Sequence, residues 1–91
     1  MTETPPAAMP APDFLKYLQG FATQVLIHLG EIDNPLEGKR TVNLELAKYA
    51  IDLLALIGTK TRGNLTPEES KFITGALYDL RMKFVARSAR R

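Results

Sequence analysis

The most apolar stretch of the chain lies between Asn43 and Thr61. When successive residues are placed about 100° apart on a helix, its apolar side chains fill an arc of roughly 160°: Leu46, Ala47, Ala50, Ile51, Leu53, Leu54 and Ile57. Lys48 and Asp52 lie four residues apart on the narrow polar side, where they can form an ion pair. Tyr49 and Leu56 lie beyond the far edge of the apolar arc. This pattern predicts a central helix that is covered by two neighbouring helices, and by a second copy of the protein if those do not suffice.

A first helix is predicted over residues 13–29, with Asp13 as its N-cap. Gly30 follows directly and suits a C-terminal position with positive φ. Six apolar positions share one face of this helix: Phe14, Tyr17, Leu18, Phe21, Val25 and Leu29. Ile27 falls instead among the polar positions, which adds to the apolar surface that a single bundle does not explain.

A third helix is predicted over residues 66–87, because Thr66, Pro67 and Glu69 match a capping box with proline at the first helical position. Two apolar stripes follow along it. The first contains Ile73, Ala76, Leu77, Leu80 and Phe84, and the second contains Tyr78, Met82 and Val85, with Gly75 beside it. One stripe is enough for a core within the chain, so the second stripe favours a contact with another molecule.

The connection over residues 30–42 has turn signals at Asp33-Asn34-Pro35 and at Glu37-Gly38. At about a dozen residues it is long for a link between two helices. It is expected to wrap around the bundle, with apolar anchors at Ile32, Leu36 and Val42. The alternative is a short two-stranded ribbon that pairs residues 31–33 with 40–42, although an isolated hairpin is only marginally stable.

Ninety-one residues correspond to one domain with a small core. We expect a disordered proline-rich arm over residues 1–12, a helical domain over 13–87 and a basic tail over 88–91. The chain has no cysteine, so disulfides cannot support it and oligomerisation is the remaining route to extra stability. No signal-peptide pattern and no apolar run of about 20 residues are present, so we expect a soluble, cytoplasmic protein that does not enter a membrane.

Charge is distributed unevenly along the chain. Residues 1–80 carry seven basic and ten acidic side chains, a balance of −3, whereas residues 81–91 carry five basic side chains and no acidic one, a balance of +5. The basic end is expected to serve solubility and to place cations at a helix C-terminus. The alternative is a contact with nucleic acid phosphates through Arg87, Arg90 and Arg91. No helix-turn-helix spacing or aromatic platform supports base recognition.

No motif indicates catalysis, a metal or a cofactor. His28 is the single histidine and lies on the apolar face of the first helix, where we expect it to be packed or half-exposed; pH sensing is the alternative role. The acidic residues Glu31, Asp33 and Glu37 do not follow the spacing of a calcium loop. With one histidine, no cysteine and no paired carboxylates on a common helix face, we expect that the protein is not an enzyme.

Three stretches together resemble a known family: residues 14–35, 42–69 and 77–85. Their most specific part runs from NLELAK to GNLTPEE within residues 43–69. The chain is similar here to a small bacterial family catalogued as a domain of unknown function, number eighteen forty-four. The resemblance implies a short, soluble, helical protein, and it supplies no catalytic residues.

These observations together predict an all-α protein, a small three-helix bundle completed by homo-oligomerisation, with a dimer favoured. The expected function is that of a non-enzymatic interaction module, with an unidentified protein partner as a further possibility. The alternative is a nucleic-acid accessory protein that uses the basic C-terminal end. The side chains expected at the oligomer interface are Tyr78, Met82, Val85, Gly75, Leu56 and Tyr49.

Overall fold

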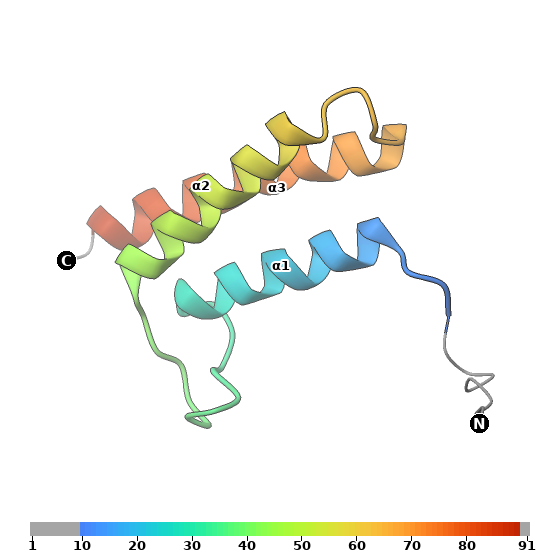
Figure 1. Ribbon diagram of the computed structural model, residues 1–91. Helices are drawn as coiled ribbons and strands as arrows, with labels where there is room; N and C mark the ends of the chain where they lie inside the picture. Colours follow the sequence, from blue (N-terminus) through green and yellow to red (C-terminus); the bar gives the residue numbers. More distant parts are fainter. Residues whose placement is uncertain (1–9, 90–91) are drawn as a thin grey trace, which may run out of the picture.

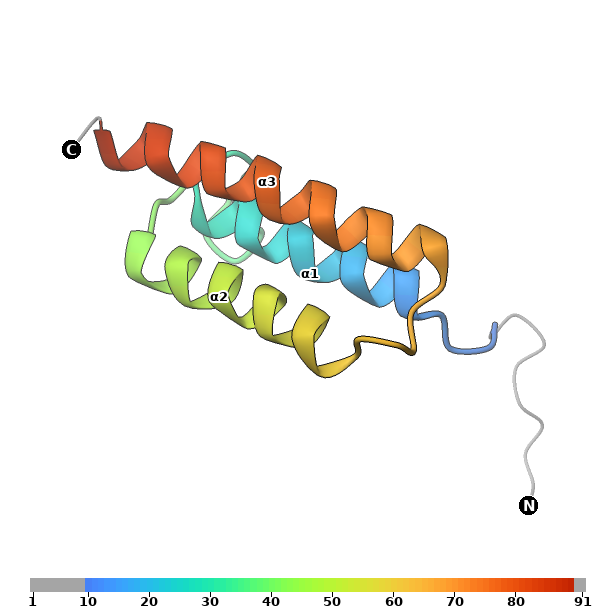
Figure 2. The same cartoon turned by 90° about the horizontal axis from the view of Figure 1, so that it is seen from above.

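The computed structural model describes residues 10–89, which form three helices and no strand. Helix α1 spans Phe14–His28, α2 spans Leu44–Lys60 and α3 spans Pro67–Ala89 (Figure 1). All three pairs of helices are in contact, and α2 runs antiparallel to both α1 and α3 (Figure 2). The predicted three-helix bundle is confirmed, whereas its completion by a second copy stays a prediction.

The ends of the chain differ in how much the structure describes. Residues 1–9 of the expected arm, together with Arg90 and Arg91, lie outside the described residues. Residues 10–12 are exposed and belong to no helix. At the other end α3 continues to Ala89, so it extends two residues into the segment expected to be a basic tail.

The three helices begin at the predicted caps. The side chains of Asp13 and Asn43 each accept a hydrogen bond from the backbone N–H three residues ahead, at 3.2 and 3.0 Å. At the start of α3 the capping box is complete, since Thr66 Oγ1 accepts from the Glu69 N–H at 3.1 Å and Glu69 Oε1 accepts from the Thr66 N–H at 2.8 Å. These contacts satisfy N–H groups that a helix N-terminus would otherwise leave unpaired.

The core lies along the line where the three helices meet. Its buried members are Leu18, Val25 and Leu29 from α1, Ala47, Ala50, Ile51 and Leu54 from α2, and Ile73 and Leu80 from α3. Tyr17 was predicted to join them and is instead 54% exposed. It lies at the edge of the α1 face, where its ring stacks on Phe14 and tilts against Phe21, with centroids 5.9 and 6.3 Å apart. Leu46 of the predicted α2 arc is also exposed.

Ile27 was predicted to lie on the polar side of the first helix, and this prediction is wrong because the side chain is buried. The reason is the return of the chain to this end of α1. The Glu31 N–H donates to the Leu26 carbonyl and the Asn43 N–H donates to the His28 carbonyl, both within 3.0 Å. The connection therefore covers the last turn of α1, which a helical pattern alone cannot show.

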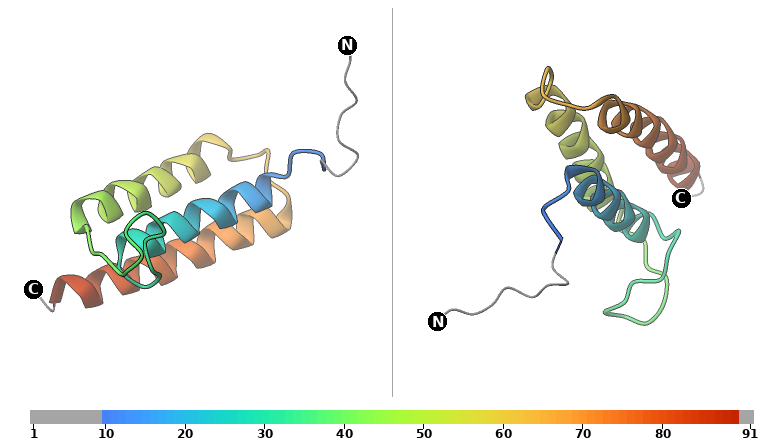
Figure 3. Two further views of the ribbon diagram at one scale, coloured as in Figure 1. Left: turned by 90° about the horizontal axis from the view of Figure 1, so that it is seen from below. Right: turned by 90° about the vertical axis from the view of Figure 1, so that its right-hand side faces the viewer.

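The connection forms a tight turn that projects from the end of the bundle (Figure 3). A single antiparallel bridge joins Asn34 and Lys39, so the ribbon considered for residues 31–33 and 40–42 is not formed. Asn34 organises the turn, because its side chain accepts from the Leu36 N–H and its carbonyl from the Gly38 N–H. Leu36 was expected to anchor the loop and is 94% exposed; Ile32 and Val42 are also exposed.

Candidate protein–protein interface

Helix α3 has apolar side chains on two opposite faces. One face carries the buried Ile73 and Leu80, and Ala76, Leu77 and Phe84 pack partly buried beside them. The other face carries Tyr78, Met82 and Val85, which we call the outer stripe. At about 100° per residue, the centre of the outer stripe lies about 155° around the helix from the buried face. A helix with this pattern has a second surface to cover once its own core is complete.

The outer stripe is open to solvent. Tyr78 is 69% exposed, Met82 56% and Val85 63%. The three side chains line a shallow groove together with Thr74, Leu77 and Arg81. Arg81 and Val85 also line the neighbouring groove towards α2, which contains Ile51 and Phe84. The outer stripe is therefore continuous with the surface between α3 and α2.

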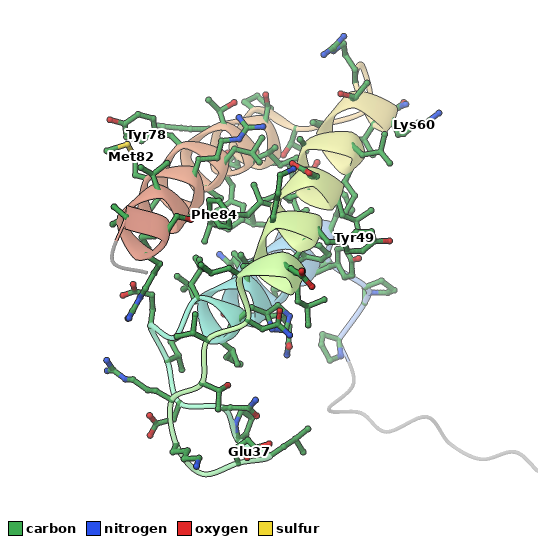
Figure 4. All side chains as sticks on the ribbon, turned by 90° about the vertical axis from the view of Figure 1, so that its left-hand side faces the viewer. Glu37, Tyr49, Lys60, Tyr78, Met82 and Phe84 are labelled. Atoms are coloured by element: carbon green, nitrogen blue, oxygen red, sulfur yellow. The ribbon has the colours of Figure 1, made fainter. Side chains whose placement is uncertain are left out.

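Tyr49 and Leu56 lie on a different side of the molecule. They are 65% and 49% exposed, and they share one face of α2 because they are seven residues apart. Figure 4 shows Tyr49 pointing away from the bundle on the side opposite to Tyr78 and Met82. The six side chains expected at one interface are thus divided between two separate surfaces, of which the outer stripe holds the more exposed set.

Gly75 lies one turn before Tyr78 on α3 and has no structural reason to be glycine within the chain. A Cβ added there would meet nothing within 4 Å. Glycine in a helix interior is about 1 kcal/mol less favourable than alanine. Gly75 lines the groove between α1 and α3, together with Ala22, Leu26 and Phe72. Gly75 therefore leaves a depression at the edge of the outer stripe.

Arg87 has a role in the fold itself. Its Nη2 donates to the carbonyl oxygen of Gly30 at 3.1 Å, and its Nε lies 3.6 Å from Glu31 Oε2. The cation thereby contacts the C-terminal end of α1, where the helix dipole is negative. Sequence patterns gave no signal for this contact, because the two partners lie 57 residues apart. With Arg90 and Arg91 outside the described residues, the geometry adds no support for phosphate binding by this end.

The remaining candidate chemistry does not converge on a site. His28 is half-buried, and burial lowers its pKa from the usual 6.5 because the charged form loses hydration. Lys48 pairs with Asp52 as predicted, and Lys83 pairs with Asp79, whose hydrogen bond raises the pKa of Lys83. Within residues 10–89 no polar or charged side chain is buried and no acidic or histidine cluster could hold a metal.

The fold and its surface define a small all-α domain with an apolar stripe outside its core. No helix within the described part of the chain has the length and hydropathy needed to cross a membrane. A family model, the domain of unknown function DUF1844, matches residues 11–86. The chain therefore belongs to this family, as the resemblance in sequence predicted. No curated protein and no solved structure matches the chain.

Proposed function

We propose that this protein is a non-enzymatic interaction module that self-associates through the outer stripe of α3. The observation that carries the proposal is the exposure of Tyr78, Met82 and Val85 beside a core that is complete without them. Large apolar side chains at helical spacing are costly to leave in water, and a contiguous exposed apolar patch typically marks a contact with another molecule.

The surroundings of the outer stripe also favour binding over chemistry. Catalytic sites usually contain partly buried titratable groups within a cleft. His28, the single histidine, is the last residue of α1, and burial lowers its pKa. No acidic side chain pairs with it among the described residues. The stripe itself is apolar, with Thr74 and Arg81 at its edge. Such a surface suits a partner with a matching apolar face.

The direct test is the molar mass in solution, measured by light scattering and sedimentation equilibrium from low micromolar to a few hundred micromolar protein. We expect a concentration-dependent dimer, because the apolar area available is modest for a permanent interface. The variant Met82→Glu should remain folded, since the side chain is exposed, and should shift the equilibrium to monomer. Leu56→Glu is the matched control, because it adds the same charge to an exposed apolar position on the other surface.

Two outcomes would reject the proposal. A wild-type chain that is folded and strictly monomeric across this range leaves the outer stripe without a second copy. A dimer that Met82→Glu leaves intact places the contact elsewhere, and if Leu56→Glu dissociates that dimer, self-association is assigned to the α2 surface. Circular dichroism of each variant confirms that the fold is retained in these comparisons.

A further inference from the structure

The outer stripe belongs to a longer seam that has a regular spacing. Gly75, Tyr78, Met82, Val85 and Ala89 follow each other at intervals of three and four residues, and all five are exposed. This spacing is that of the contact positions of two helices packed along their length at a shallow angle. The seam runs straight along α3 and ends within its last turn.

We infer that the second copy lies antiparallel along α3, with Gly75 of each copy packed against Val85 of the other. This inference rests on the proposed function and specifies its geometry. The partner is a second copy of this chain, and the twofold axis passes close to the level of Leu80. Because Leu80 is buried in the core of its own chain, the axis passes beside α3 on the opposite, solvent-facing side.

The distribution of charge along α3 favours the antiparallel orientation. The first half of the helix contains Glu68, Glu69, Lys71 and Asp79, which sum to −2. The second half contains Arg81 and Lys83 and no acidic residue, which sums to +2; Arg87 is not counted, because it pairs with Glu31 on the α1 side of the helix. An antiparallel pair places the acidic half of each helix beside the basic half of the other and also opposes the two helix dipoles. A parallel pair places like charges together along the whole contact.

The sizes of the side chains favour the same arrangement. With the twofold axis at the level of residue 80, Tyr78 of one copy faces Met82 of the other, a pair in which sulfur and aromatic ring attract each other. Gly75 then faces Val85, so that a residue without a side chain receives a branched one. A parallel pair would set Gly75 against Gly75 and leave a void, which removes packing contacts on both sides.

The area of the seam indicates how tight the contact is. The exposed fractions of Tyr78, Met82 and Val85 correspond to on the order of 350 Å² of surface in each copy, since a large side chain presents about 150 to 250 Å². Burial of the stripe and its immediate edges by two copies reaches roughly 1,000 Å², the lower end of specific interfaces. A reversible dimer with a dissociation constant in the micromolar range is expected.

The chain contains no cysteine, so single cysteines can report the orientation without interference. Two variants, Gly75→Cys and Val85→Cys, are prepared separately, one with a tag that changes its mass. Each variant alone and an equimolar mixture are treated with a short bismaleimide at a few hundred micromolar protein, because a side chain at position 75 is itself expected to weaken the dimer. In an antiparallel pair, residue 75 of one copy lies beside residue 85 of the other. The two residues 75 are therefore offset by ten residues, or about 15 Å along the helix, which exceeds the reach of the reagent.

An antiparallel pair gives cross-linked dimers that contain one copy of each variant, with at least fivefold less product from either variant alone. Cross-linking of each variant with itself overturns the inference in favour of a parallel pair and leaves the proposed function standing. If light scattering shows that the cysteine variants form dimers, but the reagent cross-links neither variant alone nor the mixture, then α3 is not the contact. A wild-type chain that is strictly monomeric rejects the proposed function itself, so the two failures are distinguishable.

Discussion

The guanidinium of Arg87, in the last turns of α3, donates a hydrogen bond to the carbonyl oxygen of Gly30 at 3.1 Å. This contact joins the C-terminal ends of α1 and α3, which are parallel neighbours. Gly30 is buried and Arg87 is about three-quarters covered at its side chain. The contact therefore joins the end of the longest helix to the rest of the bundle.

Replacement of Arg87 by methionine should lower the free energy of unfolding by about 1 kcal/mol. Hydrogen bonds to charged groups contribute about 1.5 to 3 kcal/mol, and we reduce this value because the Arg87–Glu31 pair is partly exposed. Methionine keeps the aliphatic part of the side chain, so the loss reports the polar contacts. Thermal unfolding should show a decrease of several degrees, and Arg62→Met, at an exposed position outside the outer stripe, is the control that should change little. Equal effects of the two substitutions would contradict the assigned role of Arg87.

Substitution of Gly30 by alanine should be more harmful than the same substitution at Gly38. Both glycines have positive φ, 80° and 72°, so each alanine carries a backbone penalty of about 1 kcal/mol. At Gly30 the new Cβ would also lie 2.6 Å from Val42 Cγ2 and 3.3 Å from the Thr41 carbonyl oxygen, whereas at Gly38 it meets nothing within 4 Å. Denaturant unfolding should show a loss of about 2 kcal/mol or more for Gly30→Ala. Similar losses of unfolding free energy at the two positions would show that the side chain of Val42 moves away from the new Cβ at Gly30 at no measurable cost.

Gly20→Ala and Gly75→Ala form a matched pair that separates folding from association. Both glycines lie inside helices, and neither has a neighbour within 4 Å of an added Cβ. Each alanine should raise the stability of the isolated chain by up to about 1 kcal/mol. In an antiparallel pair the Cβ at Gly75 would meet Val85 of the other copy, so Gly75→Ala should weaken the dimer about tenfold while Gly20→Ala leaves it unchanged. Sedimentation equilibrium measures the difference, and equal dimer affinities would contradict the packing at Gly75.

The burial of His28 should make the fold less stable in mild acid. Its pKa in the folded state is lowered from 6.5 by desolvation, so near this pH the unfolded chain binds more protons than the folded one. The free energy of unfolding therefore rises with pH between the lowered pKa and about 6.5, and the stabilisation by neutral His28 is lost as the pH falls through this window. Denaturant unfolding between pH 5 and 8 should show this slope, and His28→Gln should flatten it. An unchanged slope in His28→Gln would assign the pH dependence to other groups.

Local signals in the sequence were sufficient for the helices. Asp13, Asn43 and the Thr66–Glu69 pair each act within three residues along the chain, and all of these contacts are present. The positive φ of Gly30 also agrees with its predicted place after α1. The placement of Tyr78, Met82 and Val85 on another face of α3 than Ile73 and Leu80 follows from their helical spacing, because a regular helix fixes which residues share a face.

Contacts between distant segments of the chain could not be predicted from the sequence in this way. Tyr17 and Ile27 were placed on the wrong sides because helical spacing gives the angle of a side chain but not the position of the neighbours that cover it. Ile27 is buried because the connection over residues 30–42 returns to the end of α1, and Leu46 is exposed because of how α2 packs against its two neighbours. Similarly, Tyr49 and Leu56 were expected to join the outer stripe, and only the placement of α2 beside α3 shows that they lie on another side.

The sequence by itself determined the number of helices, their N-terminal limits and caps, and the presence of a second apolar face on α3, because these depend on interactions a few residues apart. The tertiary structure decided that this face remains exposed after the core is filled and that it is separate from Tyr49 and Leu56. It also decided that Arg87 donates a hydrogen bond to the carbonyl oxygen of Gly30. These properties depend on how the three helices pack, and packing is set by the shapes of side chains brought together from distant parts of the chain.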